Sequence, residues 1–79
     1  MKKMVRVSLN SIGTVKSFVN TLSRFEAEFV LYNGRFVIDA KSIMGIFSLD
    51  LSKPIDLHIE AEDKDMDTIL GALKPYTVD

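Results

Sequence analysis

The 79-residue chain contains no cysteine, and its single histidine is His58. The absence of cysteine excludes a disulfide framework, a thiolate metal site and a cysteine nucleophile. Long apolar runs are also absent, since none approaches the roughly 20 residues that a membrane-spanning helix requires. Lys2 and Lys3 precede an alternating segment rather than the continuous apolar stretch of a signal peptide. We therefore expect a cytoplasmic protein that does not enter a membrane.

The short chain limits where a function can reside. We expect one domain over residues 1–79, because a chain of this size buries only about 60% of its unfolded surface and cannot enclose a large substrate cavity. The net charge is -1, with seven basic and three acidic side chains in residues 1–41 and three basic and eight acidic ones in residues 42–79. This asymmetry either steers a charged partner or is uneven decoration of a solvated surface. The scattered basic residues argue against direct nucleic-acid binding.

Hydrophobic periodicity predicts seven elements in the order β-α-β-β-α-β-α. The predicted elements are strand 5–9, helix 12–24, strands 27–32 and 35–39, helix 43–49, strand 55–61 and helix 63–74. The apolar stripe of the first helix comprises Ile12, Val15, Phe18, Val19, Leu22 and Phe25. Asn33-Gly34 between two β-rich runs predicts a hairpin with a type I′ turn, whose two central residues both need positive φ.

Polar residues precede each predicted helix and can cap it. The predicted N-caps are Asn10 or Ser11, Ser42 and Asp63, and Pro75 should end the last helix near Lys74.

These elements predict an α+β open-faced sandwich, with an antiparallel four-stranded sheet covered by helices on one face. In strand 55–61, apolar residues alternate with Asp56, His58 and Glu60, so this polar side should meet water. A ferredoxin-like domain is the nearest alternative, but it has no place for the helix predicted at 43–49.

Three segments carry a more specific resemblance. The segments 23–28 (SRFEAE), 31–34 (LYNG) and above all 41–49 (KSIMGIFSL) resemble the corresponding parts of HPr, the phosphocarrier of the bacterial sugar phosphotransferase system. The likeness extends over nearly the whole chain. It implies the HPr fold, with sheet order 1-4-2-3 and three helices on one face.

The chain departs from this family at the phosphocarrier motif, Gly-(Leu/Ile)-His-Ala-Arg-Pro-Ala, at the start of the first helix. Aligned without gaps, Ser11 stands at the histidine, Gly13 at the arginine and Thr14 at the proline. Phosphohistidine is a high-energy species on a group that titrates near neutrality, whereas a serine phosphate is a stable ester. The arginine that would balance phosphate charge is also missing. We therefore expect no catalytic residue and no conventional carrier role.

His58 does not replace the missing histidine, because it belongs to the polar face of its strand. It is either a solvent-facing strand residue or part of a metal site with Asp56 or Glu60. Period-2 spacing is automatic in a strand, so the solvent-facing interpretation is preferred and no metal or other cofactor is expected.

Ser42 is by itself an ordinary helix cap. The resemblance gives it a second role, because it matches the serine that HPr kinase phosphorylates in HPr proteins of Gram-positive bacteria, and Lys41, Ile43, Met44 and Gly45 match its neighbours. A phosphate there would face free backbone N–H groups at the positive end of the helix.

The segment 43–49 has more apolar side chains than a short helix can bury. We expect Met44 and Phe47 to be exposed beside the start of the first helix, and Ile43, Ile46 and Leu49 to be the candidates for the core. The predicted partner-binding residues are Lys41, Ile43, Met44, Phe47, Ser11 and Gly13.

The leading hypothesis is a non-enzymatic regulatory protein of the phosphotransferase system, switched by phosphorylation at Ser42. Its expected partners are proteins: HPr kinase and a transcriptional regulator or phosphotransferase components. This logic is similar to that of catabolite-repression HPr, which lacks the histidine and retains the serine. The alternatives are a degenerate phosphocarrier and a constitutive interaction domain on the HPr scaffold.

Overall fold

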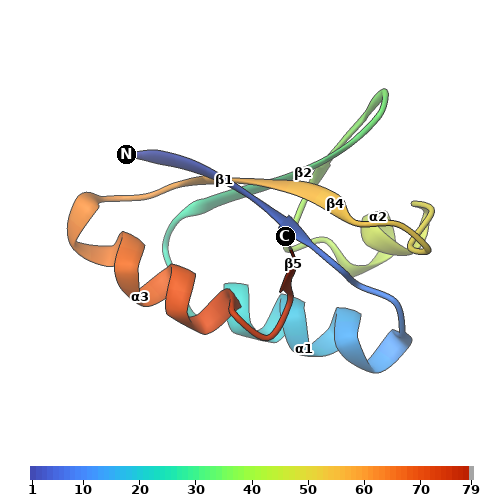
Figure 1. The fold of residues 1–79 in the computed structure, drawn as a ribbon, viewed down its shortest axis with the longest axis horizontal. Helices are drawn as coiled ribbons and strands as arrows, with labels where there is room; N and C mark the ends of the chain where they lie inside the picture. The colour runs from blue at the N-terminus through green and yellow to red at the C-terminus, as the bar shows by residue number, and fades with distance from the viewer. Residues whose placement is uncertain (79) are drawn as a thin grey trace.

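The computed structural model describes residues 1–78 and arranges them as an antiparallel sheet with three helices on one side (Figure 1). The elements are β1 (Lys2–Val7), α1 (Ile12–Leu22), β2 (Glu28–Asn33), β3 (Phe36–Asp39), α2 (Ile43–Phe47), β4 (Ile55–Glu60), α3 (Asp63–Leu73) and β5 (Thr77–Val78). The predicted α+β class and the predicted order of the first seven elements are confirmed.

The sheet has the strand order β3-β2-β4-β1-β5. The first four positions agree with the predicted order 1-4-2-3. The sequence analysis missed β5, which pairs with β1 through Val78 opposite Arg6 and Thr77 opposite Val7. Two residues are too few to produce a periodic pattern, so this strand depends on the long-range pairing with β1.

Side-chain alternation separates the two faces of the sheet. In β4, Ile55, Leu57 and Ile59 are buried under the helices, whereas His58 and Glu60 are exposed on the other face. The polar face predicted for this strand is therefore confirmed. The buried core consists of Val7, Leu9, Val15, Phe18, Leu22, Phe29, Leu31, Ala40, Ile46, Leu49, Ile55, Leu57, Ile59, Met66, Ile69, Leu73 and Tyr76.

The β2–β3 hairpin differs from the prediction by one position. Asn33 pairs with Phe36, so the two central residues are Gly34 and Arg35 rather than Asn33 and Gly34. Gly34 has φ of 62°, and no other residue of the described chain has a positive φ. Glycine at the first central position with a negative φ at the second is the pattern of a type II′ turn. The predicted type I′ turn is wrong, because it would force Asn33 into the left-handed region.

Two helices end earlier than predicted. α1 stops at Leu22 instead of Arg24, and the hydroxyl of Ser23 donates a hydrogen bond of 2.7 Å to the Val19 carbonyl. α2 stops at Phe47 instead of Leu49, and Ser48 donates to the Gly45 carbonyl at 2.6 Å. Serine hydroxyls satisfy helix carbonyls in this way and favour ends over continued helix.

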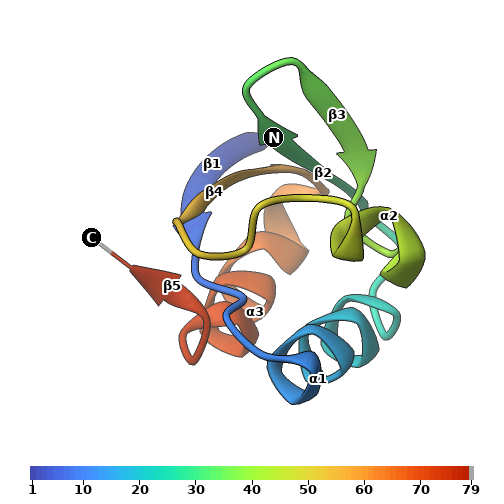
Figure 2. The same cartoon turned by 90° about the vertical axis from the view of Figure 1, so that its right-hand side faces the viewer.

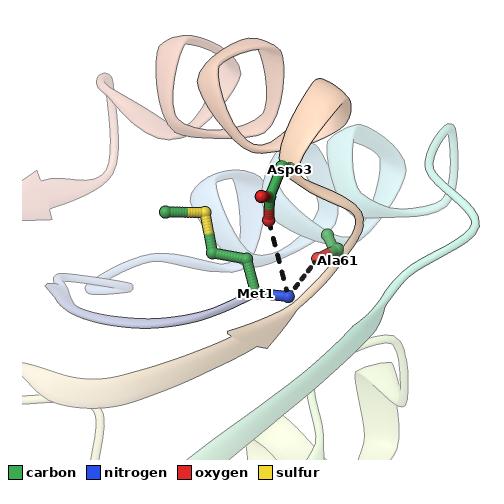
Figure 3. A network of polar contacts seen from close by, with 3 residues as sticks. All are labelled: Met1, Ala61 and Asp63. Atoms are coloured by element: carbon green, nitrogen blue, oxygen red, sulfur yellow. Dashed lines mark hydrogen bonds and ion pairs between the residues drawn. The ribbon is translucent and has the colours of Figure 1, made fainter.

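The start of α3 also differs from the prediction. Glu62 occupies the N-cap position without a side-chain hydrogen bond, and Asp63 is the first helical residue rather than the cap. Figure 3 shows how this corner is held: the Met1 amino group donates to the Ala61 carbonyl at 2.9 Å and lies 3.8 Å from the Asp63 carboxylate. The helix ends at Leu73 with Lys74 as C-cap, as predicted from Pro75.

Tyr76 fixes the segment after α3 against α1. Its ring packs edge-on against Phe18, with 5.4 Å between the centroids, and its hydroxyl is hydrogen-bonded to Ser17. None of the helices in residues 1–78 is long and apolar enough to cross a membrane.

Candidate functional site

The candidate site lies where the start of α1 and helix α2 meet at one end of the molecule. Figures 1 and 2 both place the beginning of α1 and the whole of α2 at this end, and the two helices are in contact. The exposed side chains at the start of α1 and those of α2 therefore lie at the same end of the molecule.

Ser42 is the N-cap of α2, as predicted. Its backbone is extended (φ -94°, ψ 100°), its Oγ accepts a hydrogen bond of 3.3 Å from the Gly45 N–H, and the residue is exposed. An exposed hydroxyl that bonds only to a backbone amide is accessible to an enzyme and keeps its place without burial.

Gly45 was named in the sequence analysis only as a match to the family, and its structural role in this site was not predicted. A Cβ at this position would lie 2.8 Å from Cγ2 of Ile38 and 3.1 Å from Oγ of Ser42. Only glycine therefore allows α2 to approach β3 so closely while donating to the cap. The available signal was a lone glycine inside a short apolar helix.

Ser11 is the N-cap of α1, one of the two residues predicted for that position. Its Oγ accepts from the Thr14 N–H at 3.1 Å and is 2.8 Å from the Thr14 hydroxyl. Gly13 is exposed in the first turn and contributes no side chain. Ser11 thus has a capping geometry, and its hydroxyl has no histidine or carboxylate among its hydrogen-bond partners in residues 1–78.

The apolar residues of α2 divide as expected between surface and core. Met44 is 76% exposed and Phe47 is 38% exposed, whereas Ile46 is fully buried. Leu49 is buried as well, and Ile43 is half-buried against the core.

Ile12 corrects the predicted apolar stripe of the first helix. It is 64% exposed rather than part of the core, because the first residue of α1 extends beyond the turn that faces the sheet. Val15, Phe18 and Leu22 are buried as predicted. Ile12 therefore adds a third exposed apolar side chain, with Met44 and Phe47, to this end of the molecule. We call these three residues the α1–α2 apolar patch.

Lys41, one of the predicted partner-binding residues, makes two contacts within the protein. Its Nζ donates a hydrogen bond of 2.8 Å to the Phe25 carbonyl and lies 5.6 Å from the centroid of the Phe29 ring. The side chain ties the residue before Ser42 to the segment that follows α1.

His58 lies on the opposite side of the sheet from this end. It is exposed on β4, and its ring centroid is 4.2 Å from that of Tyr32. No group of three or more histidine, aspartate or glutamate residues with a metal-binding arrangement occurs within residues 1–78. The histidine and Ser11 are therefore not brought together.

Asp50 lies in the turn that follows α2. Hydrogen bonds from the Ser52 hydroxyl and from the Ser52 backbone N–H lower the pKa of the Asp50 carboxyl, and the charge of Lys53 lowers it further. The carboxylate is thus charged and held by its own turn at neutral pH.

Comparison with known proteins gives a consistent result. The family model described as "PTS HPr component phosphorylation site" matches residues 14–77. The structure resembles HPr from Bacillus anthracis, with a TM-score of 0.69 and 30% identity over 99% of this chain and 96% of that one. It also resembles HPr-C-His from Thermoanaerobacter tengcongensis, with a TM-score of 0.66 and 27% identity over 92% of this chain and 85% of that one. A Mycoplasma histidine-containing phosphocarrier protein, 17% identical over 95% of this chain and 89% of that one, shares the fold with a TM-score of 0.67.

Proposed function

This chain belongs to the HPr family of the phosphotransferase system, and we propose that it is a regulatory member, which binds partner proteins and does not relay phosphate. In this proposal residues 1–79 form one cytoplasmic HPr-like domain without a cofactor or enzymatic activity. The observation that carries it is the exposed cap Ser42 at the start of a helix whose Met44 and Phe47 face solvent.

The start of α1 supports the loss of the carrier role. The gap-free alignment puts Ser11 at the histidine of the family motif, and the family match begins only at Thr14. A serine needs a neighbouring base to become a nucleophile, yet the Ser11 hydroxyl is engaged with Thr14. His58 lies on the other face of the sheet and cannot supply that base.

The cap geometry supports phosphorylation at Ser42. A phosphate there adds a charge near -2 beside the Gly45 N–H, which already donates to this side chain. Negative charge is stabilising at a helix N-terminus. Phosphorylation would therefore change the surface potential around Met44 and Phe47 while leaving the fold intact.

We propose that partners dock on the α1–α2 apolar patch together with the half-buried Ile43 and the exposed backbone at Ser11 and Gly13. Exposed apolar groups surrounded by polar ones are typical of protein-docking surfaces. The partners proposed are HPr kinase, and a transcriptional regulator or phosphotransferase components. Lys41 would act by holding the segment before Ser42 in place through Phe25.

The first experiment tests the switch. The protein is incubated with ATP and a cognate HPr kinase, and the phosphorylated position is located by mass spectrometry. We expect one phosphate on Ser42, its loss in Ser42→Ala and its retention in Ser48→Ala, a matched exposed serine at the other end of α2. Absence of phosphate on Ser42 would remove the switch from the proposal.

The second experiment tests the docking surface. Binding to the kinase is measured for Met44→Ser and for Val78→Ser, since Val78 is also exposed, at 38%, but lies in β5. We expect the first change to weaken binding at least fivefold and the second to have little effect. Equal effects of both changes would contradict docking through α2.

The degenerate carrier is tested separately by adding phosphoenolpyruvate and enzyme I. Acid-labile phosphate on the chain would establish a carrier role and overturn the central proposal. If the kinase adds no phosphate but Met44→Ser still weakens partner binding, the constitutive interaction domain is the correct alternative.

A further inference from the structure

The uncovered face of the sheet carries an exposed apolar and aromatic patch that the proposed function does not use. We call it the sheet-face patch, and it consists of Met4, Val30, Tyr32, Val37 and His58. The strand register makes these residues neighbours: Met4 and Val30 both lie opposite His58, and Tyr32 lies opposite Val37. Figure 1 shows no helix over this side of the sheet.

The sheet-face patch is open to a partner. Met4 is 55% exposed, Val37 is 63% exposed and Tyr32 is 39% exposed. The rings of Tyr32 and His58 lie 4.2 Å apart and help to line a depression of about 400 Å³. Such a surface can accept the apolar part of a long side chain.

Charge around the sheet-face patch is predominantly negative. By strand alternation the same face presents four carboxylates against two cations; the acidic residues are Glu28, Asp39, Asp56 and Glu60, and the basic residues are Lys2 and Arg6. The depression within it is lined by Glu28 and Glu60, by Lys2 and Lys3, and by residues of the patch, so the excess of negative charge belongs to the whole face rather than to the depression.

Glu28 and Glu60 carry the most specific part of this pattern. They are direct cross-strand partners of β2 and β4, an arrangement in which like charges destabilise the sheet. Glu60 has Lys2 at 3.9 Å, whereas Glu28 makes no ion pair within residues 1–78. A cation placed between the two carboxylates would relieve their repulsion.

We propose that this face docks a basic, extended segment of a partner protein. A lysine or arginine of that segment would place its charge on the Glu28–Glu60 pair and lay its aliphatic stem over Val30 and Tyr32. Arginine would also gain cation–π attraction from the Tyr32 ring. A second copy of this chain would set a face with four carboxylates and two cations against an identical one, so the excess of negative charge disfavours self-association through this face.

This docking surface is separate from the one proposed around Ser42. α1 and α2 lie on the helix side of the sheet, and the sheet-face patch lies on the other side (Figures 1 and 2). A failure of either proposal therefore leaves the other unaffected.

The chain contains its own control for charge alone. The start of α3 has exposed acidic residues, including Glu62, Asp65 and Asp67, and the helix itself has no exposed large apolar side chain. A ligand that responds only to negative charge should bind there as well as on the sheet. A ligand that needs both charge and apolar contact should prefer the sheet face.

The test is an NMR titration of the ¹⁵N-labelled full chain with the acetylated and amidated peptide Lys-Val-Arg-Val-Lys. We expect saturable amide shifts in Met4, Val30, Tyr32 and His58, and none with the peptide Glu-Val-Glu-Val-Glu. The double variant Glu28→Gln/Glu60→Gln should weaken binding about fivefold, the effect of losing two partly exposed charge contacts. Both glutamates are exposed, so the fold should persist, which circular dichroism checks.

The matched control is Asp65→Asn/Asp67→Asn, which changes the net charge by the same amount and should leave the affinity unchanged. Tyr32→Thr retains a strand-forming residue and should weaken binding through the loss of the ring. Shifts centred on α3, equal losses in the two double variants, or no saturable shift at millimolar peptide would overturn the proposal. A dimer that buries Tyr32 in sedimentation equilibrium would overturn it as well, because the face would then belong to a second copy.

Discussion

Replacement of Ser42 by alanine and by aspartate tests whether α2 can accept a charge without losing its structure. Alanine removes the 3.3 Å hydrogen bond between the Gly45 N–H and Oγ. Loss of an N-cap usually costs about 1 kcal/mol. Because this bond is long and the site is exposed, we expect a loss of about 0.5 to 1 kcal/mol in the free energy of unfolding for Ser42→Ala.

Aspartate should behave differently because it keeps an acceptor and adds a negative charge at the helix N-terminus. A negative charge at such a position stabilises a helix by about 0.3 to 1 kcal/mol. The free energy of unfolding of Ser42→Asp should therefore lie within about 0.5 kcal/mol of that of the unchanged protein. Ser11→Ala is a useful comparison, since Ser11 caps an eleven-residue helix with a shorter hydrogen bond of 3.1 Å. This substitution should lower the free energy of unfolding at least as much as Ser42→Ala does.

Urea unfolding followed by far-UV circular dichroism measures these differences. With a slope near 1 kcal/mol/M for a small protein, the midpoint should fall by about 0.5 to 1 M in Ser42→Ala and by less than about 0.5 M in Ser42→Asp. If Ser42→Asp is destabilised as much as Ser42→Ala, the helix start does not accept negative charge. A phosphate at that position would then disturb the fold, contrary to the proposed switch.

Three further predictions concern the packing and charge of this structure. Gly45→Ala should lower the unfolding free energy by about 1 to 3 kcal/mol, because the new methyl group meets Ile38 Cγ2 at 2.8 Å; an unchanged urea midpoint would refute the close approach. Tyr76→Phe should lower the unfolding free energy by about 1 kcal/mol through loss of the part-buried hydroxyl contact with α1. The same urea unfolding measures this loss, and an unchanged midpoint would contradict a stabilising role for the hydroxyl. Asp50 should titrate by NMR with a pKa below the usual aspartate value, and Ser52→Ala should raise that pKa. Since the pKa of Asp50 is lowered in the folded protein, the contribution of Asp50 to stability is present at neutral pH and is lost as the pH falls through that pKa. An unchanged Asp50 pKa in Ser52→Ala would show that the Ser52 hydroxyl does not lower it.

The layers of the fold were predictable because two periodicities fix most of the burial. Alternation in β4 assigns Ile55, Leu57 and Ile59 to the core, and the structure buries all three. The caps at Ser11 and Ser42 were predictable for a local reason, since each serine directly precedes a change to helical spacing and its side chain can reach an amide three residues later.

The hairpin register could not be read from Asn33-Gly34 alone. A turn centred on those two residues would pair Leu31 with Phe36, whereas the structure pairs Leu31 with Ile38. A type I′ turn centred on Asn33 and Gly34 would need positive φ at both residues, whereas the observed turn needs it at Gly34 alone. In the observed register Ile38 lies opposite Leu31 and packs half-buried against the core.

The exposed residues of the candidate site show a second limit. Ile12 matches the helical spacing of its buried neighbours, and only the position of the first turn relative to the sheet leaves it in solvent. Periodicity gives the direction of a side chain around the helix axis and says nothing of where the sheet ends. Met44 and Phe47 were predictable as exposed because a five-residue helix has too little surface facing the core for all its apolar groups.

The different surroundings of Ser42 and Ser11 bear on the proposed regulation through this surface. Both serines cap helices, Ser11 that of α1 and Ser42 that of α2, but their surroundings differ. The Ser11 hydroxyl is doubly engaged with Thr14, whereas the Ser42 hydroxyl makes one long bond. On a protein of net charge -1, a phosphate on Ser42 would bring the total near -3. That charge would sit beside Met44, so an apolar docking surface would acquire an anionic edge that a partner with paired arginines can distinguish from the unmodified form.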